Sequence, residues 1–506
     1  MNEFQRRSAE INDLLCVLNV LNWDARTQMP AGGSSARAQQ LATISALAQE
    51  KLLDPAYEAS AQAVSGDDLE NRAAQQALEA ISALRRIPAE LTRELALLKA
   101  EAQEVWARAK AANDFGLFAP SLTRMVELNQ QLAEALGYEG HPYDALLNMY
   151  EPGVTVATLL PLFEQLRAHH VPLLQAIQQQ PQPRNDFLNR SYGTAEQKRL
   201  SLGLAQKFGY DTSRGRLDES AHPFEISFTR QDVRITTRIQ ENFLPGALFG
   251  TLHEAGHAMY EQGVRPELSR TVLASDLLGL YAVGGASYGT HESQSRLWEN
   301  RIGRSKAYWD LHFPQLQEAF PEALADVDTA TFHRAVNTVR PSLIRVEADE
   351  LTYDLHIMLR VELERALIGG DLAVKDLPAA WNARIKSDLG LDVPDDARGV
   401  LQDIHWSAGM IGSFPTYTIG NVMASQFYAA ARQQMPELED TLVRGEYAPL
   451  REWLTDNIYQ HGRTYAPHEL LTRVTGRGLD PQPYLDYLSG KYAELYGLNT
   501  QKEQIT

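Results

Sequence analysis

Residues 246–262 read GALFGTLHEAGHAMYEQ, and this stretch predicts a metal-binding helix. Pro245 directly precedes it and suits a first helical turn. His253 and His257 are four residues apart, so their imidazoles project from one face of the helix and can bind one ion. Glu254 is the next residue, where its carboxylate can take a proton from a water that the metal has acidified.

The same five residues could instead be a pair of surface histidines beside an acid. Apolar residues precede the motif and place it on a mostly buried helix: Ala247, Leu248, Phe249 and Leu252. Histidine and glutamate side chains are costly in such a place unless they have partners. The surroundings therefore favour a metal site.

A catalytic zinc ion needs a third protein ligand and an open fourth position. Glu292, in the tetrapeptide HESQ at 291–294, is the leading candidate, and it is expected to open a helix that runs to Arg304. His291 is a rival ligand. Glu292 could also be an ordinary carboxylate at a helix N-terminus, where the helix dipole favours it. The residues alone leave these alternatives open.

One segment departs from the helical pattern. Residues 224–228 and 233–239 alternate apolar and polar side chains, which predicts a β-hairpin with one buried face just before the metal motif. An extended substrate can add to the edge of such a hairpin. The polar, proline-marked stretch 178–183 is interpreted as a surface loop within one fold.

Elsewhere apolar residues recur at three- and four-residue intervals, so the predicted fold class is mainly α, with a small β-sheet. A single catalytic domain is expected over residues 1–506. Residues 68–112, interrupted by Pro88, predict a long helical hairpin. The other expected helices cover residues 2–23, 34–52, 114–138 and 155–180.

Composition excludes several classes of function. The 506 residues carry a net charge of −18, which argues against nucleic acid as a partner and against a polybasic membrane anchor. The one cysteine, Cys16, cannot form an intrachain disulfide. We find neither a secretory signal nor an apolar run of membrane-spanning length, so a cytoplasmic location is expected.

Five motifs follow one another along the chain: DVRIT at 232–236, HEAGH at 253–257, HESQ at 291–294, IRVEAD at 344–349 and GVLQDIHW at 399–406. Together with the tripeptide HPF at 222–224, they resemble the thermostable carboxypeptidase Taq family of metallocarboxypeptidases, peptidase family M32. The resemblance covers nearly the whole chain.

The resemblance implies a large helical zinc-peptidase fold with a small sheet beside a deep substrate groove, usually as a homodimer. It implies His253, His257 and Glu292 as ligands of zinc, or of cobalt, and Glu254 as the general base. The implied function is release of single amino acids, with broad specificity, from peptides that have a free C-terminus. The hairpin is associated in this family with closing the end of the groove.

A carboxypeptidase must also recognise the substrate's α-carboxylate, for which arginine is best suited. Arg345, expected in a helix over 341–359, is the first choice, and Arg234 on the hairpin is its rival. Arg345 could instead be a structural residue paired with an acid.

Further polar residues near these motifs could assist. Tyr417 could donate to the carboxylate or to a developing oxyanion, or it could be a core aromatic. His405 could stabilise the oxyanion or lie behind the site. Asp349 and Asp403 could orient metal-bound imidazoles, or pair with arginines or cap helices.

Two other functions stay open at this point. A zinc oligopeptidase or dipeptidyl carboxypeptidase would use the same metal chemistry but release different products. A metal-bearing peptide-binding protein without catalysis would have no need of Glu254, and a purely structural site usually closes its fourth position.

Overall fold

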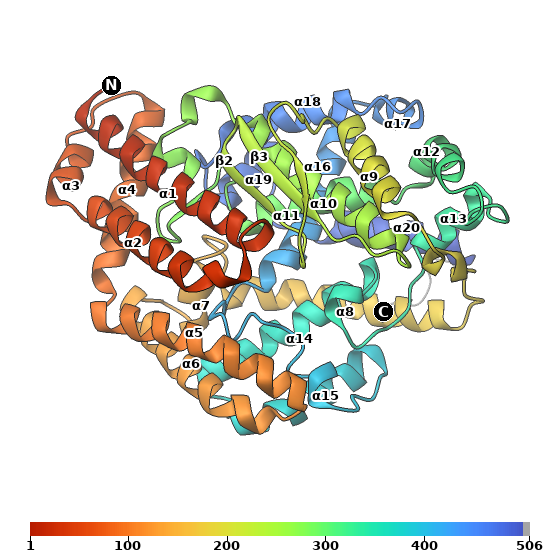
Figure 1. Cartoon of the computed structure of the whole chain (residues 1–506), viewed down its shortest axis with the longest axis horizontal. Helices are drawn as coiled ribbons and strands as arrows, with labels where there is room; N and C mark the ends of the chain where they lie inside the picture. The colour runs from red at the N-terminus through yellow and green to blue at the C-terminus, as the bar shows by residue number, and fades with distance from the viewer. Residues whose placement is uncertain (499–506) are drawn as a thin grey trace. The chain divides into compact units, whose positions relative to one another are not determined.

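The computed structural model describes residues 1–498, in which most of the chain is helical and the strands are short (Figure 1). The predicted fold class, mainly α with a small sheet, is confirmed. Among the described residues, no helix combines the length and the apolarity that a membrane crossing requires.

The chain forms two compact units, each assembled from separate stretches of sequence. The first unit contains residues 1–85, 184–336 and 427–478, and the second contains residues 86–183, 337–426 and the described residues after 478. One boundary follows directly on the proline-marked loop at 178–183. The single domain predicted for residues 1–506 stays a prediction.

The helices of the first unit surround the sheet and the metal motif. They include the predicted helices at 2–23, 34–52 and 246–262, which are confirmed within a few residues at each end. They are α1 (Glu3–Thr27), α2 (Ser34–Leu52), α3 (Pro55–Gln62), α4 (Asp68–Arg86), α9 (Thr194–Phe208), α10 (Leu244–Gly263), α11 (Tyr288–Arg296), α12 (Lys306–Ala319), α13 (Thr329–Val336), α17 (Leu438–Val443), α18 (Ala448–Asn457) and α19 (Pro467–Thr475).

The helices of the second unit pack around α14. The predicted helices at 114–138 and 155–180 are confirmed as α6 and α8. The unit contains α5 (Ala89–Ala112), α6 (Phe115–Leu136), α7 (Pro142–Leu147), α8 (Val156–Gln178), α14 (Glu350–Gly369), α15 (Leu377–Leu389), α20 (Gln482–Tyr496) and the first part of α16 (Pro415–Gln434).

The helical hairpin predicted for residues 68–112 is wrong. The break at Pro88 is present, but α4 joins the apolar core of the first unit through Ala73, Ala77 and Ile81, whereas α5 packs along α6 in the second unit. Helical periodicity indicates which face of a helix is buried but not which helix covers it.

The predicted β-hairpin is confirmed as β2 (Glu225–Thr229) and β3 (Asp232–Thr237), which pair antiparallel. A third strand, β1 (Leu217–Glu219), pairs parallel with β3 and gives the order β1-β3-β2. Three residues are too few to show the alternation that marks a strand. The sheet contacts α10 and α1, and Figure 1 shows β2 and β3 beside α10.

Glycine at position 256 allows α10 and α11 to cross at close range. A Cβ atom there would lie 2.6 Å from the carbonyl oxygen of Gln294 and 2.6 Å from the Cα atom of Ser295, both on α11. No side chain fits at that distance without moving one of the helices. Gly256 lies within the metal motif itself, so the crossing brings α11 onto the turn that carries both histidines.

A buried carboxylate ties together the helices of the second unit. Asp354 on α14 is fully buried and accepts hydrogen bonds from Thr418 (2.7 Å) and Asn421 (2.9 Å) on α16 and from Tyr484 (2.7 Å) on α20. A buried carboxylate group that accepts this many hydrogen bonds fixes the positions of α14, α16 and α20 relative to one another.

We expect Gly256→Ala to lower the free energy of unfolding by about 1–3 kcal/mol, because the added methyl overpacks the crossing of α10 and α11. Gly203→Ala on α9 is the matched control, because no heavy atom lies within 4 Å of its added Cβ. This control should be neutral or stabilising by up to about 1 kcal/mol. Urea denaturation of the two variants measures the difference, and equal stabilities would contradict the close crossing.

Candidate metal centre

Three predicted ligands meet in the first unit. His253 and His257 lie one turn apart on α10, with their ring centroids 4.9 Å apart, and Glu292 faces them from α11. The Oε2 atom of Glu292 lies 3.8 Å from His253 Nε2 and 3.5 Å from His257 Nε2. The possible ligand atoms of the three residues all lie within 4.8 Å of one another.

These distances fit a small divalent metal ion. Ligands bound tetrahedrally at about 2.0–2.1 Å lie about 3.3 Å from one another, which is close to the observed spacing of 3.5 and 3.8 Å. Two imidazoles and one carboxylate are also the donor set of a catalytic zinc site that keeps one position open. The described residues therefore offer a metal site of the predicted composition.

Glu292 lies inside a helix rather than at its beginning, which corrects the expected start of this element. The helix α11 begins at Tyr288, capped by Ser287, and continues beyond Arg296 as a π-helical turn, Leu297–Ile302. Glu292 is therefore not a carboxylate of the first helical turn.

The second oxygen of Glu292 is held by an arginine of the same helix. Arg296 donates from Nε to Oε1 of Glu292 at 2.7 Å, which leaves Oε2 facing the histidines. Burial alone would raise the pKa of Glu292, but the charges of Arg296 and His253 outweigh it and hold the pKa well below its usual range. Glu292 is thus an ionised carboxylate with one oxygen available.

His253 is oriented by a carboxylate that the sequence did not reveal. Its Nδ1 atom lies 2.9 Å from Oε2 of Glu299, on the π-helical turn, and Arg304 donates to the other oxygen of Glu299 at 2.9 Å. Burial would raise the pKa of Glu299, but the bond to His253 and the charge of Arg304 lower it below its usual range. Such a partner leaves Nε2 of His253 free to bind metal.

His291, the rival ligand, lies outside the triad. Its Nδ1 atom contacts Nδ1 of His257 at 2.6 Å, and its Nε2 atom contacts Glu261 at 2.9 Å. Both ring nitrogens of His291 therefore make contacts other than with the ligand atoms of the triad.

His257 is uncharged near pH 7. Burial lowers its pKa to about 3, so its neutral imidazole keeps a lone pair.

Glu254, the predicted general base, lies on α10 between the two histidines in sequence. Its side chain is buried, and it accepts no hydrogen bond from the residues that the structure describes. Burial raises its pKa to about 7, against the opposing charges of His253 and Arg26. Arg26 lies on α1 with its guanidinium 3.4 Å from the ring of Phe224. A carboxyl group with a pKa near 7 can both take and give a proton at neutral pH.

The predicted residues Arg345, Tyr417 and His405 gather within the second unit. The guanidinium of Arg345 lies 5.4 Å from the ring of Tyr417, and the hydroxyl of Tyr417 lies 3.2 Å from Nε2 of His405. Burial lowers the pKa of His405 to about 4, and the neighbouring Arg345 adds to this. His405 is therefore neutral at neutral pH.

Arg345 is bound to an acid, as the structural alternative required. It donates to Oδ1 of Asp403 from Nε (3.0 Å) and Nη2 (2.8 Å) and to the hydroxyl of Tyr353 from Nη1 (2.9 Å). The helix expected over 341–359 is wrong, because Arg345 lies in a short 3-10 turn and α14 begins only at Glu350.

Asp349 and Asp403 do not have the role that was considered for them. Asp349 caps α14 by accepting from the backbone N–H groups of Leu351 and Thr352, each at 3.0 Å. Asp403 accepts from Arg345 and also from Arg360, at 2.6 Å. The Nδ1 atoms of the two triad imidazoles instead contact Glu299 and His291.

Arg234, the rival for the substrate carboxylate, is also paired. It forms a bidentate pair with Asp232 at 2.9 and 2.8 Å and lies over the rings of Trp23 (4.4 Å) and Phe228 (4.7 Å). These contacts anchor the hairpin to α1.

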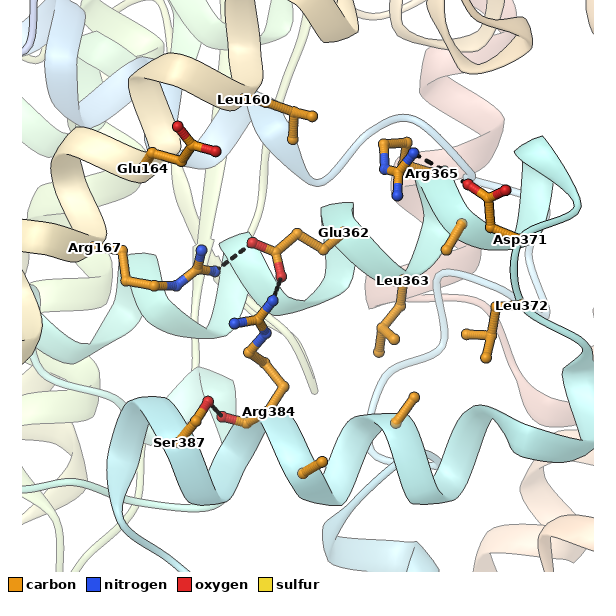
Figure 2. Close-up of a pocket in the computed structure, with 13 residues that line it drawn as sticks. Leu160, Glu164, Arg167, Glu362, Leu363, Arg365, Asp371, Leu372, Arg384 and Ser387 are labelled. Atoms are coloured by element: carbon orange, nitrogen blue, oxygen red, sulfur yellow. Dashed lines mark hydrogen bonds and ion pairs between the residues drawn. The ribbon is translucent and has the colours of Figure 1, made fainter.

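A separate cavity of about 660 Å³ lies in the second unit, and none of the predicted site residues lines it (Figure 2). Figure 2 shows Arg167 and Arg384 directed at Glu362, and Arg365 paired with Asp371. The distance between Arg365 Nη1 and Asp371 Oδ2 is 3.3 Å. Each arginine that lines this cavity is paired with a carboxylate inside the second unit.

Some signals for the missed residues were present in the sequence. Glu261 follows His257 by four residues, as His257 follows His253, so a ladder of one residue per turn already ran along one face of α10. Arg296 likewise follows Glu292 by four residues. No local pattern could have linked Arg26 to Glu254, because their proximity depends on how α1 packs.

Comparisons with known families, sequences and structures all match this chain to carboxypeptidases. The profile of the carboxypeptidase Taq (M32) metallopeptidase family matches residues 3–492. Thermostable carboxypeptidase 1 of Thermus thermophilus is 41% identical over 98% of both chains, and carboxypeptidase 1 of Bacillus subtilis is 39% identical over 94% of this chain and 95% of its own. The crystal structure of an M32 carboxypeptidase from Deinococcus radiodurans superimposes with a TM-score of 0.94, at 42% identity, over 98% of this chain and 99% of that one.

We expect Asp403→Asn to lower the free energy of unfolding by about 3–5 kcal/mol near pH 7, because it removes the carboxylate that two buried arginines share. Asp392→Asn, on a side chain that is 87% exposed, is the control and should change stability by less than about 0.5 kcal/mol. Urea denaturation measures both variants.

The same comparison at lower pH tests the charge itself. Burial would raise the pKa of Asp403, but Arg360 and Arg345 hold it far below its usual range. A lowered pKa stabilises the fold above the unfolded pKa of about 4, and that stabilisation is lost as the pH falls towards the folded value. The difference in the free energy of unfolding between Asp403→Asn and the unmodified protein should therefore become smaller below about pH 4. A constant difference would contradict the ion pair.

Proposed function

The chain belongs to the carboxypeptidase Taq (M32) family of metallopeptidases, and we propose from that premise how its residues carry out the reaction. It is a metal-dependent carboxypeptidase, a hydrolase that acts on peptide bonds. The observation that carries the residue assignment is the convergence of two imidazoles, one free carboxylate oxygen and a buried acid with a raised pKa.

His253, His257 and Glu292 hold the metal ion in this proposal. The ion, when bound, would polarise the scissile carbonyl and lower the pKa of a water molecule. Zinc is the proposed metal and cobalt an alternative, because imidazole and carboxylate donors accept both.

Glu254 is the proposed general base. Its carboxylate takes a proton from the attacking water and then passes it to the nitrogen of the leaving amino acid. The buried position supports this role, since a pKa of about 7 makes both transfers accessible at neutral pH.

Arg345 is the proposed receptor for the carboxylate of the substrate's last residue. An arginine has five N–H groups, and the bonds to Asp403 and Tyr353 use three of them. The remaining two can bind a carboxylate while Asp403 fixes the orientation of the guanidinium. Tyr417 and His405 are proposed as further donors, and Arg234 as the alternative receptor.

We propose that the products are single amino acids, released with broad specificity from peptides that have a free C-terminus. Mass spectrometry of the products from one short peptide tests this against the oligopeptidase and dipeptidyl carboxypeptidase alternatives. Successive loss of single C-terminal residues supports the proposal, whereas internal cuts or released dipeptides contradict it. The non-catalytic alternative is set aside by membership of a carboxypeptidase family.

The homodimer, the cytoplasmic location and the absence of nucleic-acid and membrane partners stay predictions. The homodimer rests on the resemblance, and the expected absence of nucleic-acid and membrane partners rests on the net charge of −18. The location rests on the sequence signals considered above. Light scattering at working concentrations tests the dimer.

Glu254→Gln should bind one metal ion per chain as before but lose turnover by about 10²–10⁴-fold, because the amide cannot accept the proton. Elemental analysis and hydrolysis of a short peptide measure the two effects. Glu267→Gln, on an exposed residue beyond the end of α10, is the control and should leave both unchanged. Near-normal turnover by Glu254→Gln would remove Glu254 from the mechanism.

Arg345→Ala should lower kcat/KM for peptides with a free C-terminus by about 100-fold, the effect of losing charged hydrogen bonds worth about 3 kcal/mol. The same variant should lose much less on C-terminally amidated peptides, which lack the carboxylate. Arg365→Ala, on a half-buried arginine of α14 paired with Asp371, is the matched control. Equal losses on free and amidated peptides would count against Arg345.

A further inference from the structure

Three side chains of the first unit form a hydrogen-bonded line behind the ligand His257. His257 Nδ1 contacts His291 Nδ1 at 2.6 Å, and His291 Nε2 contacts Oε1 of Glu261 at 2.9 Å. The mechanism above uses neither His291 nor Glu261. Both are nearly inaccessible, with side chains that are 12% and 5% exposed.

Glu261, at one end of this line of side chains, is a hydrogen-bond acceptor. It receives the backbone N–H groups of Gly284 (2.8 Å) and Gly285 (2.9 Å) and the hydroxyl of Ser227 (3.1 Å). Burial would raise the pKa of Glu261, but the bond to His291 and the backbone donors lower it. An ionised carboxylate can only accept, so His291 must donate to it from Nε2.

The direction of the remaining bond follows from that donor. His257 can bind a metal ion through Nε2 only when its own proton is on Nδ1. That proton then lies in the 2.6 Å contact between the two Nδ1 atoms, where Nδ1 of His291 accepts it. A proton on Nδ1 of His257 leaves the lone pair on Nε2, the atom that lies 3.5 Å from Oε2 of Glu292.

A second carboxyl group near His291, that of Glu225, does not compete for its Nε2 proton. Oε2 of Glu225 lies 4.0 Å from His291 Nε2, beyond hydrogen-bond distance. Burial and the neighbouring charges of Glu261 and Glu254 raise the pKa of Glu225 well above its usual range. Of these two carboxyl groups, Glu261 alone lies within hydrogen-bond distance of His291 Nε2.

The fold leaves His291 little freedom to leave this position. Its ring stacks on Tyr260, with centroids 5.3 Å apart and planes at 28°. Gly285 also lies against the ring, since a Cβ atom there would come within 2.3 Å of its Cδ2 atom. The ring is therefore held between α10 and the chain before α11.

We propose that His291 and Glu261 are positioning residues that fix the tautomer of His257 and thereby raise the protein's affinity for its metal. The inference rests on the proposed role of His257 as a ligand. It gives His257 the same kind of support that Glu299 gives His253, with one imidazole inserted between ligand and carboxylate. Outer partners of this kind typically contribute 10–100-fold to metal affinity.

Two substitutions of His291 separate hydrogen bonding from packing. In His291→Gln the amide oxygen can accept from His257 and the amide N–H can donate to Glu261, whereas His291→Leu can do neither. We expect His291→Leu to weaken zinc binding by about 10–100-fold and His291→Gln by no more than about 3-fold. Competition with a chromophoric chelator measures zinc affinity, and the melting temperature of each metal-free protein measures how far the substitution destabilises the fold.

The tautomer itself gives a signature that packing alone would not move. Nitrogen-15 NMR of histidine-labelled, metal-free protein should show the proton of His257 on Nδ1 in the unmodified chain and in His291→Gln. It should show a mixture of tautomers in His291→Leu. If His291→Leu does not fold, Glu261→Gln takes its place and should weaken zinc binding by about 10-fold.

The outcomes distinguish this inference from the proposed function. If His257→Ala binds zinc as tightly as the unmodified chain, the ligand assignment fails and the inference fails with it. If His257→Ala loses zinc while His291→Leu and Glu261→Gln bind it normally, the ligand assignment stands and the positioning role is wrong. Equal weakening by His291→Gln and His291→Leu would also contradict the role, because it would reflect packing.

Discussion

The crossing of α10 and α11 at Gly256 is the constraint on which the metal centre depends. A Cβ atom added at this position would lie only 2.6 Å from the backbone of α11, so the two helices approach more closely than a side chain here would allow. Consecutive turns of α10 supply His253 and His257, and α11 brings the Glu292 oxygen to within 3.5 and 3.8 Å of their Nε2 atoms. A wider crossing would keep every ligand in the sequence and separate them in space.

Around this crossing, each carboxylate takes its character from its partners. Glu292, Glu299 and Glu261 each accept N–H groups from arginine, histidine or backbone, and their pKa values are lowered although burial acts in the opposite direction. Glu254 accepts no hydrogen bond from the described residues, so burial raises its pKa to about 7. Three of these four neighbouring acids are therefore ionised hydrogen-bond acceptors, and the fourth, Glu254, can exchange a proton near neutral pH.

The parts of the account that the sequence could predict are those fixed by local spacing. Two histidines four residues apart, the alternation of the hairpin and the helical intervals of α1, α2 and α6 all depend on neighbours in the chain. Glu292 needed the family resemblance, because 35 residues of sequence separate it from His257.

The predictions that were wrong, and the residues that were missed, depended on packing between segments distant in the sequence. The stretch at 68–112 is helical on both sides of Pro88, yet its halves join different cores. Arg345 lies in a stretch with helical periodicity, yet α14 begins only after it, where Asp349 caps the helix. The guanidinium of Arg345 instead donates to Asp403, 58 residues away in the sequence. Glu299 could not be recognised as the partner of His253 without the π-helical turn that carries it.

The position of a bound metal ion tests the central claim most directly. Crystals of the protein grown with zinc, measured on both sides of the zinc absorption edge, should show one strong anomalous peak in the first unit. The account predicts that this peak lies within about 2.0–2.2 Å of His253 Nε2, His257 Nε2 and Oε2 of Glu292. A peak bound to His291 in place of one of these atoms, or a strong peak elsewhere with none at the triad, would contradict it.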